Sequence, residues 1–408
     1  MDTHQTDAAL RLVELGAVLL GLGILTRLAS RIGISAVPFY LLAGLAFGDG
    51  GITKLDSTGG FIEVAAEVGA VLLLLLLGLE YSARDLIWTG RTHWRTGIAD
   101  IVLNALPGAA AGLLLGWGLP GALALAGVTY VSSSGIVSQL LRDMRWRRNP
   151  ETAPVVGILV IEDLVMAPYL PILVVVVGGG GLLAGLLGAG IGLLVVAIVI
   201  GIGLRNRNVL DRFIGLRDPV ALLLTVLGIA VLAAGFADSV GFSGAVAAFL
   251  VGLLLTGQVA ETARTRLDPL RDLFAALFFV AIGLSTDPAE IPGVLPIALA
   301  LAVVTIATKH VVGWLAARHR PGVIGPLRAG ALLSARGEFS VLVAGIAATS
   351  TLLPSSFQAL VTTYVLITAI VAPILARIAV PLGSRITRVP VADQVGHVAD
   401  GSDINHGE

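Results

Sequence analysis

The chain has 408 residues, of which 56% are hydrophobic and only 13% are charged, and its mean hydropathy is +0.94. Soluble domains carry about 25% charged residues, so this composition excludes an ordinary soluble protein and indicates one that crosses a lipid membrane several times. The formal net charge of −1 argues against a nucleic-acid partner, and the lack of cysteine excludes disulfides, thiolate metal sites and a cysteine nucleophile.

Thirteen apolar segments are candidates for membrane spans. A transmembrane helix needs about 20 apolar residues, and no segment shows the period-two alternation of a barrel strand. The sequence therefore predicts an all-α polytopic membrane protein with about 13 transmembrane helices. The segments are centred near Leu20, Leu42, Leu73, Ala110, Ser132, Val165, Val195, Val226, Leu250, Phe279, Val304, Val341 and Ile367.

Arginines mark alternate loops between these segments. Every odd-numbered loop in chain order contains at least two arginines. Lys54 is the only lysine or arginine in the even-numbered loops, and Arg11 is the only one in the N-terminal tail. The positive-inside rule places arginine-rich loops in the cytoplasm. We therefore expect a multi-pass protein with its N-terminus outside the cell and its C-terminus in the cytoplasm.

Polar residues interrupt the fifth apolar segment. Residues 129–138 include Ser132, Ser133 and Ser134 followed by Gly135, and this composition weakens helix preference at mid-membrane. Small residues also let membrane helices pack closely, and close packing alone is one explanation of the pattern. The alternative explanation is a broken helix whose half-helix ends form part of an ion site, with the serine hydroxyls as oxygen ligands.

Two adjacent acidic residues, Glu162 and Asp163, lie in the middle of the sixth apolar segment, residues 155–177. An aspartate near the bilayer centre costs about 2.5–3.5 kcal/mol on insertion scales, so we expect the pair to face a water-filled cavity, bind a cation or carry a proton. Adjacent helix positions point about 100° apart, so one carboxylate can face a cavity while the other meets a neighbouring helix. These residues indicate an ion transporter.

Lys309 lies in the eleventh apolar segment, residues 297–316, and is one of only two lysines in the chain. Snorkelling is one explanation, because the long stem of a lysine can carry its ammonium to the membrane interface. The other explanation is functional. A buried lysine can release its proton, which an arginine cannot do at accessible pH, and Lys309 would then be a neutralisable partner of Glu162. His310 is expected to pack or to face the interface.

The twelfth apolar segment contains a second interruption, residues 333–340, with Arg336, Gly337 and Glu338. Each interrupted segment is followed directly by one more span, and matching interruptions in two halves are typical of inverted-repeat transporters. We therefore predict a core in which spans 4–6, about residues 98–177, face spans 11–13, about residues 294–380. Arg336 and Glu338 are expected to form a structural pair that neutralises half-helix dipole ends rather than to bind ions directly.

The membrane domain is predicted to cover residues 1–388. Residues 389–408 are polar and contain little that could form a core, so we expect a disordered cytoplasmic tail. No soluble domain is expected within these residues, and a nucleotide-sensing or regulatory module would then be a separate chain.

These features resemble the monovalent cation:proton antiporter-2 family, which includes potassium efflux systems and bacterial sodium/proton antiporters with a thirteen-helix fold. The resemblance covers about residues 12–388. It rests on the acidic pair Glu162-Asp163, on Lys309, and on the motifs Leu77-Gly-Leu-Glu80, Asp268-Pro-Leu-Arg-Asp272 with the stretch that follows to Ser285, and Arg336-Gly-Glu-Phe-Ser340.

The resemblance implies that Asp163 is the essential carrier, which binds a monovalent cation and a proton in turn. Glu162 stands where relatives have glutamine, asparagine or aspartate. Relatives with Gln-Asp include potassium efflux systems, whereas Asp-Asp with a lysine is typical of electrogenic sodium antiporters, and Glu-Asp with Lys309 matches neither pattern fully. The implied function is K+/H+ exchange by alternating access, with Na+/H+ exchange as the alternative.

The resemblance also implies a location in the inner (plasma) membrane of a bacterium, surrounded by lipid. It implies a homodimer without a cofactor. Because the long regulatory extension of some potassium efflux relatives is missing, the chain looks like the membrane subunit of a two-gene potassium/proton antiporter, with a possible separate cytoplasmic regulatory subunit.

A gated cation channel is the alternative from another class, because the same polar core can line a pore. Channels more often build their filters by symmetry from a few helices per subunit, whereas thirteen spans with two broken helices favour alternating access. An intramembrane aspartyl protease needs two aspartates on different helices, and no Gly-x-Gly-Asp sequence is present to supply the second. The chain is therefore not expected to be an enzyme.

Overall fold

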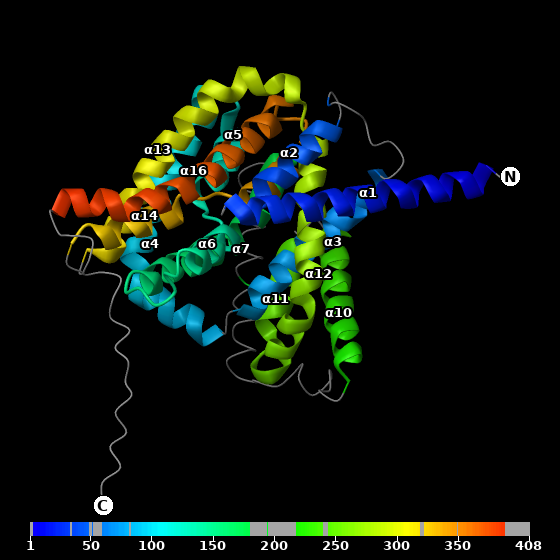
Figure 1. Ribbon diagram of the computed structural model, residues 1–408, viewed down its shortest axis with the longest axis horizontal. Coiled ribbons are helices and arrows are strands. Elements are labelled where there is room, and N and C mark those ends of the chain that lie inside the picture. The colour runs from blue at the N-terminus through cyan, green and yellow to red at the C-terminus, as the bar shows by residue number, and fades with distance from the viewer. Residues whose placement is uncertain are drawn as a thin grey trace, which may run out of the picture.

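The computed structural model describes ten stretches of the chain, and every regular element in them is a helix (Figure 1). The described residues are 3–32, 35–48, 51, 59–80, 83–179, 194, 218–239, 244–318, 322–348 and 350–387. The helices are α1 (Thr3–Ile32), α2 (Val37–Phe47), α3 (Gly59–Glu80), α4 (Ala83–Leu114), α5 (Gly118–Tyr130), α6 (Ser134–Asp143), α7 (Thr152–Val177), α10 (Pro219–Ser239), α11 (Gly244–Leu254), α12 (Gly257–Leu284), the 3₁₀ turn η1 (Pro288–Glu290), α13 (Ile291–Ala317), α14 (Ile324–Leu333), α15 (Glu338–Ala348) and α16 (Ser356–Thr387).

The predicted spans correspond to these helices in chain order. The fifth span corresponds to α5 and α6 and the twelfth to α14 and α15, while each of the others except the seventh corresponds to one helix. The seventh, centred near Val195, lies outside the described residues, as does the predicted tail. The all-helical fold class and both interruptions are therefore confirmed.

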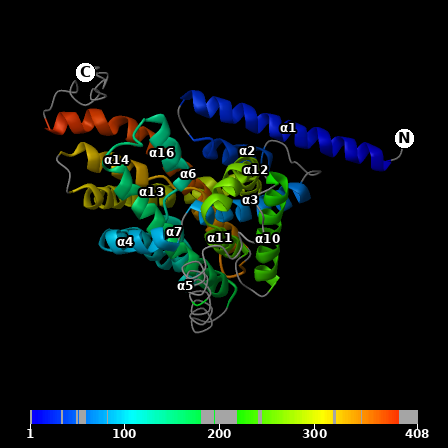
Figure 2. The same cartoon turned by 90° about the horizontal axis from the view of Figure 1, so that it is seen from below.

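Two groups of helices lie on opposite sides of the molecule (Figures 1 and 2). One group contains α3, α10, α11 and α12, whose apolar faces share a core that includes Leu72, Leu75 and Val226. The other contains α4, α13, α14 and α16. Small residues permit close helix contact inside this second group: a Cβ on Gly330 of α14 would come within 2.7 Å of the Cα of His310 on α13. This approach holds the backbone of α14 against the helix that carries Lys309.

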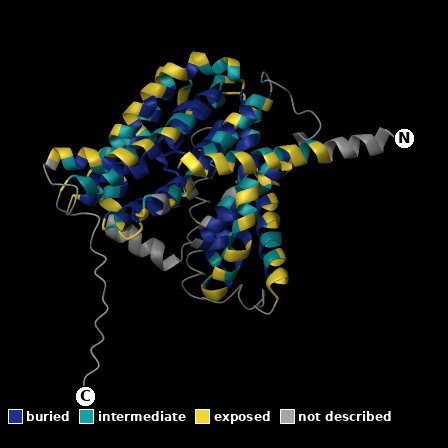
Figure 3. Ribbon diagram, in the orientation of Figure 1, coloured by how far each residue is buried: buried dark blue, intermediate teal, exposed yellow. Residues whose placement is uncertain are grey.

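The interrupted helices are the most enclosed of the seven segments in the described part of the chain that are long and apolar enough to cross a membrane. The stretches Gly118–Leu141 and Ile324–Ala348 have 78% and 72% of their most apolar windows buried, against 11–39% for the other five. Figure 3 shows the same contrast between a buried interior and exposed outer helices. Irregular backbone at membrane depth needs protein or water around it, so the two interruptions lie where the fold can satisfy them.

Candidate functional site

Arg336 occupies the point where two half-helices end. Helix α5 ends at Tyr130 and α14 ends at Leu333, and the last carbonyls of each lack partners within their own helix. The fully buried guanidinium of Arg336 donates from Nε and Nη2 to the carbonyl of Thr129, at 3.1 and 2.9 Å, and from Nη1 to the carbonyl of Leu333, at 2.9 Å. One cation thus meets the negative dipole ends of both half-helices.

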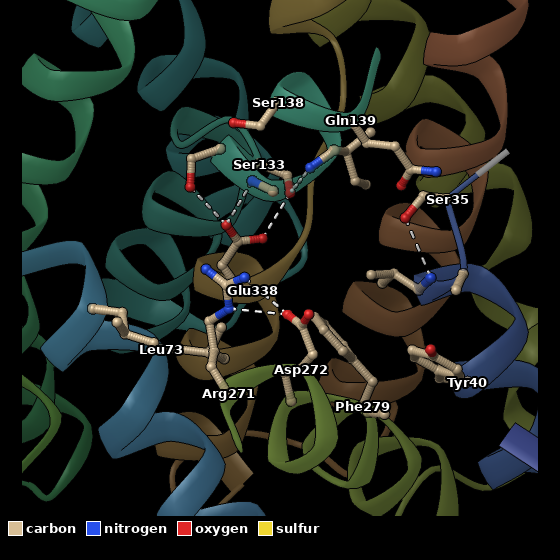
Figure 4. Close-up of a pocket in the computed structure, with 18 of the residues that line it drawn as sticks. Ser35, Tyr40, Leu73, Ser133, Ser138, Gln139, Arg271, Asp272, Phe279 and Glu338 are labelled. Carbon is tan, nitrogen blue, oxygen red and sulfur yellow. Dashed lines mark hydrogen bonds and ion pairs between the residues drawn. The ribbon is translucent and has the colours of Figure 1, made fainter. Parts of the chain in front are cut away.

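Glu338 lies at the opposite kind of end. It is the first residue of α15, and its carboxylate accepts hydrogen bonds from Ser133 Oγ at 2.6 Å, Ser134 Oγ at 2.9 Å and Gly135 N at 3.3 Å, at the start of α6 (Figure 4). An anion is favourable at a helix N-terminus. Arg336 and Glu338 therefore contact different half-helix ends, and their side chains act on separate dipoles.

Glu162 connects α7 to the first interruption. Its carboxylate is fully buried; Oε2 accepts a hydrogen bond of 2.5 Å from the Ser132 amide, and Oε1 lies 3.0 Å from Ser132 Oγ. The same Oε1 accepts a 2.6 Å hydrogen bond from Lys309 Nζ. Lys309 Nζ and the Ser132 amide both donate to this carboxylate, so Glu162 joins α7 to α13 and to the first interruption.

Lys309 lies inside the protein, with a side-chain exposure of 0%. Its ammonium forms two ion pairs, with Glu162 at 2.6 Å and with Asp100 at 2.7 Å, and it lies 5.7 Å from the centre of the Tyr130 ring. The ammonium does not reach the membrane interface, which excludes snorkelling. The neighbouring His310 places its Nδ1 2.8 Å from the carbonyl of Ile306 and contributes nothing to this cluster.

Asp100 is the residue of this cluster that the sequence analysis missed. It lies on α4, fully buried, and its Oδ1 accepts hydrogen bonds from Lys309 Nζ and from Asn104 Nδ2 at 2.7 and 2.9 Å. Asn104 in turn accepts a 2.7 Å bond from Thr308 Oγ1 on α13. A signal was present: Asp100 and Asn104 are four residues apart, so they share one face of an otherwise apolar span.

Asp163, next to Glu162 on α7, is 4% exposed. A cavity of about 450 Å³ lies beside the interruption and is lined from one side by Ser133, Ser134 and Glu338, and from the other by Arg271 and Asp272 of α12 (Figure 4). Asp163 is not among the described residues that line it. The oxygen atoms of Glu338, Ser133 and Ser134 are therefore the ones from the interruptions that line this cavity.

Hydrogen bonds and ion pairs connect many of the residues singled out from the sequence into one network: Ser132, Ser133, Ser134, Glu162, Lys309, Arg336 and Glu338. The carboxylate and hydroxyl oxygens of this network are ligands of the kind that hard monovalent cations prefer. Within the described residues, no group of three or more His, Cys, Asp or Glu side chains is arranged to hold a resident metal ion.

Residues 16–380 match the transmembrane family of sodium/hydrogen exchangers. The chain belongs to this family. Two antiporter subunits are similar in sequence to this exchanger. It is 30% identical over 382 residues to the K(+)/H(+) antiporter subunit KhtU of Bacillus subtilis, covering 89% of this chain and 92% of that protein. It is 31% identical over 349 residues to the ammonium/H(+) antiporter subunit AmhT of Alkalihalophilus pseudofirmus, covering 83% and 87%.

Solved structures of the sodium proton antiporter MjNhaP1 from Methanocaldococcus jannaschii share the fold of this exchanger. The structure at pH 8 superposes with a TM-score of 0.66 at 20% identity, covering 92% of this chain and 99% of that one. An electron-microscopy structure of the same protein gives a TM-score of 0.65 at 18% identity, covering 95% and 98%. The resemblance found in the sequence motifs is thus confirmed: the chain is a multi-pass membrane protein of a cation/proton antiporter family, which is a family of transporters.

Proposed function

We propose that this exchanger moves K+ across a bacterial inner membrane in exchange for H+, and that Asp163 binds each ion in turn. The observation that carries the proposal is the division of labour between adjacent carboxylates on α7. Glu162 is committed to Lys309 Nζ and to the amide of Ser132. Asp163, buried beside it at the centre of the same helix, is the group we assign to the transported ions.

Coupling follows from the cost of burying a charge. A carboxylate in a low-dielectric core is stable when a proton or a cation neutralises it, and is costly otherwise. If the core crosses between its two facing states only when Asp163 is neutralised, a proton moving one way must alternate with a cation moving the other way. The moving core is proposed to consist of residues 98–177 and 294–380 within a membrane domain of residues 1–388.

The choice of K+ is supported by relatives rather than by the site's geometry. KhtU is named a K(+)/H(+) antiporter subunit and AmhT an ammonium/H(+) antiporter subunit. Ammonium and K+ are monovalent cations of similar size, so both names favour a site larger than one for Na+. Na+/H+ exchange on the same fold is the alternative, and a gated channel is the alternative of another class.

We further propose a homodimer with the N-terminus outside and a cytoplasmic C-terminal tail, residues 389–408. Both relatives are named as subunits, which supports a second, cytoplasmic regulatory chain for this exchanger as well. Such a chain would bind at the cytoplasmic face, where the arginine-rich loops are predicted to lie. The transported ions, and no cofactor, are the ligands that the exchange requires.

The test is proton flux in inside-out vesicles with an internal pH-sensitive dye. K+, NH4+ and Na+ are added in turn to vesicles with the wild-type protein, Asp163→Asn, or the control Asp218→Asn, whose parent side chain is exposed before α10. A K+ response that is lost in Asp163→Asn and retained in the control supports the proposal. A response to Na+ alone would support Na+/H+ exchange instead. Retained flux in Asp163→Asn would contradict the assignment of Asp163 as the ion-binding group. Cation flux that a proton gradient cannot drive uphill would indicate a channel.

A further inference from the structure

Lys309 is bracketed by carboxylates from two different helices. Asp100 from α4 lies 2.7 Å from its Nζ and Glu162 from α7 lies 2.6 Å from it, and the three side chains are fully buried. The exchange proposed above uses Asp163 and gives Asp100 no part. A second buried carboxylate on one ammonium is costly to desolvate, so its presence calls for a role.

Asp100 contacts α13 directly through Lys309 and indirectly through Asn104 of its own helix. Its Oδ1 receives both Lys309 Nζ and Asn104 Nδ2, whereas its Oδ2 is buried and has no hydrogen-bond partner in the described part of the chain. Asn104 completes the contact with α13 through Thr308 Oγ1 at 2.7 Å. A buried oxygen without a partner is unusual and needs an explanation beyond local structure. Asp100 is instead oriented around the ammonium of Lys309.

Glu162 alone would be an unreliable counter-ion during transport. It precedes the proposed carrier Asp163, and a cation bound beside it would compete for its charge. An ammonium that lost its only anion in a low-dielectric core would release its proton, and the cycle would then move two protons for each cation. Asp100 reaches Lys309 from another helix and supplies a second anion that is not adjacent to Asp163 in the chain.

We infer that Asp100 is a positioning residue that keeps Lys309 charged throughout the cycle, so that one proton exchanges for one cation and no net charge moves. The inference rests on the proposed function. The other titratable or charged groups near Lys309 in the described residues are Tyr130 of α5, Asp163 of α7, His310 of α13, Tyr364 of α16 and Arg336. Of these, only Asp163 carries the exchanged proton.

The test compares charge movement with proton flux in the same proteoliposomes. Currents are recorded after K+ concentration jumps on a solid-supported membrane, and dye-detected K+/H+ exchange is measured in parallel. The wild-type protein should exchange without a current. Asp100→Asn should exchange with a transport current, and its apparent K+ affinity should change about 100-fold per pH unit instead of about tenfold, because two protons compete instead of one. Asp100→Glu should restore the wild-type behaviour, and Asp218→Asn should not depart from it.

Several results would overturn the inference. A current in the wild-type protein would do so, and so would an Asp100→Asn variant with no current and an unchanged pH profile. If Asp100→Asn fails to fold, the double variant Asp100→Asn/Lys309→Gln decides: it should fold better than the single variant, since no ammonium is left with half its counter-charge. Equal instability of the two variants would show that Asp100 acts independently of Lys309. A wild-type protein without K+-dependent proton flux would contradict the proposed function instead.

Discussion

The amide of Ser133 donates a hydrogen bond of 2.9 Å to the carbonyl of Ala335, and this bond joins the interruption between α5 and α6 to the one between α14 and α15. The two interruptions are about two hundred residues apart in the chain, yet their backbones touch. Because main-chain atoms make this connection, it forms only if the backbones of the two interruptions come into close contact. Gly337 is the residue that permits the approach.

Gly337→Ala is expected to abolish transport and to lower thermal stability. A Cβ at this position would lie 2.5 Å from Ser133 Oγ and 2.8 Å from Ser133 Cβ, so the crossing would have to open. Overpacking of this kind costs about 1–3 kcal/mol. Thermal melting followed by size-exclusion chromatography measures the loss. Gly345→Ala on α15 is the matched control, because its nearest neighbour would be Ile282 Cδ1 at 3.8 Å; equal melting temperatures for both variants would contradict the prediction.

Arg336→Lys is expected to destabilise the protein although it keeps the charge. The guanidinium reaches the carbonyls of Thr129 and Leu333 simultaneously, and a lysine has neither the planar fork nor the reach to do so. Loss of these buried charge-assisted bonds should cost about 2–4 kcal/mol. The melting temperature in detergent is the measurement, with exposed Arg385→Lys as control. A variant as stable as the control would show that charge alone is sufficient at this position.

Glu338→Gln should weaken transport more than it weakens the fold. A glutamine places a donor where the carboxylate accepts from Ser133, Ser134 and Gly135, and it removes the anion from the start of α6. The free energy of unfolding is expected to fall by about 1–2 kcal/mol. The KM for the cation should rise, because Glu338 also lines the cavity. Vesicle flux at several K+ concentrations tests this. Glu290→Gln, at an exposed carboxylate bonded to Ser355, is the control; an unchanged KM would restrict Glu338 to a capping role.

Competition between proton and cation at Asp163 predicts how transport depends on pH. Raising the pH on the side where K+ binds removes the competing proton, so the apparent KM for K+ should fall about tenfold per pH unit while protons occupy most of the sites. Initial rates of exchange over a matrix of K+ concentration and pH provide the measurement. A KM that stays constant while only the maximal rate changes would mean that the two ions bind at separate groups.

The sequence predicted the helices and the interruptions well, because hydropathy and small polar residues decide both locally. It also singled out Glu162 and Lys309, since charges within apolar spans are rare. The sequence analysis did not identify Asp100 as a site residue, because it lies near the start of its apolar span, where an acidic residue is typical of the end of a loop. The partners of Arg336 and Glu338 could not be predicted either. They are main-chain atoms and hydroxyls on a distant segment, and their register depends on how the two interruptions cross.

The contacts of Arg336 also have a consequence for how the protein is made. The carbonyl of Thr129 receives its donors from a residue 207 positions later in the chain. Ribosomes synthesise about 5–20 residues per second, so roughly 10–40 s pass between the synthesis of α5 and that of Arg336, and the carbonyl lacks these donors during this time. During that interval the first interruption is an incomplete membrane segment that depends on water, lipid headgroups or the insertion machinery to shield its polar backbone. The ion site is therefore assembled late, and a chain truncated before α14 should be a substrate for membrane quality-control proteases.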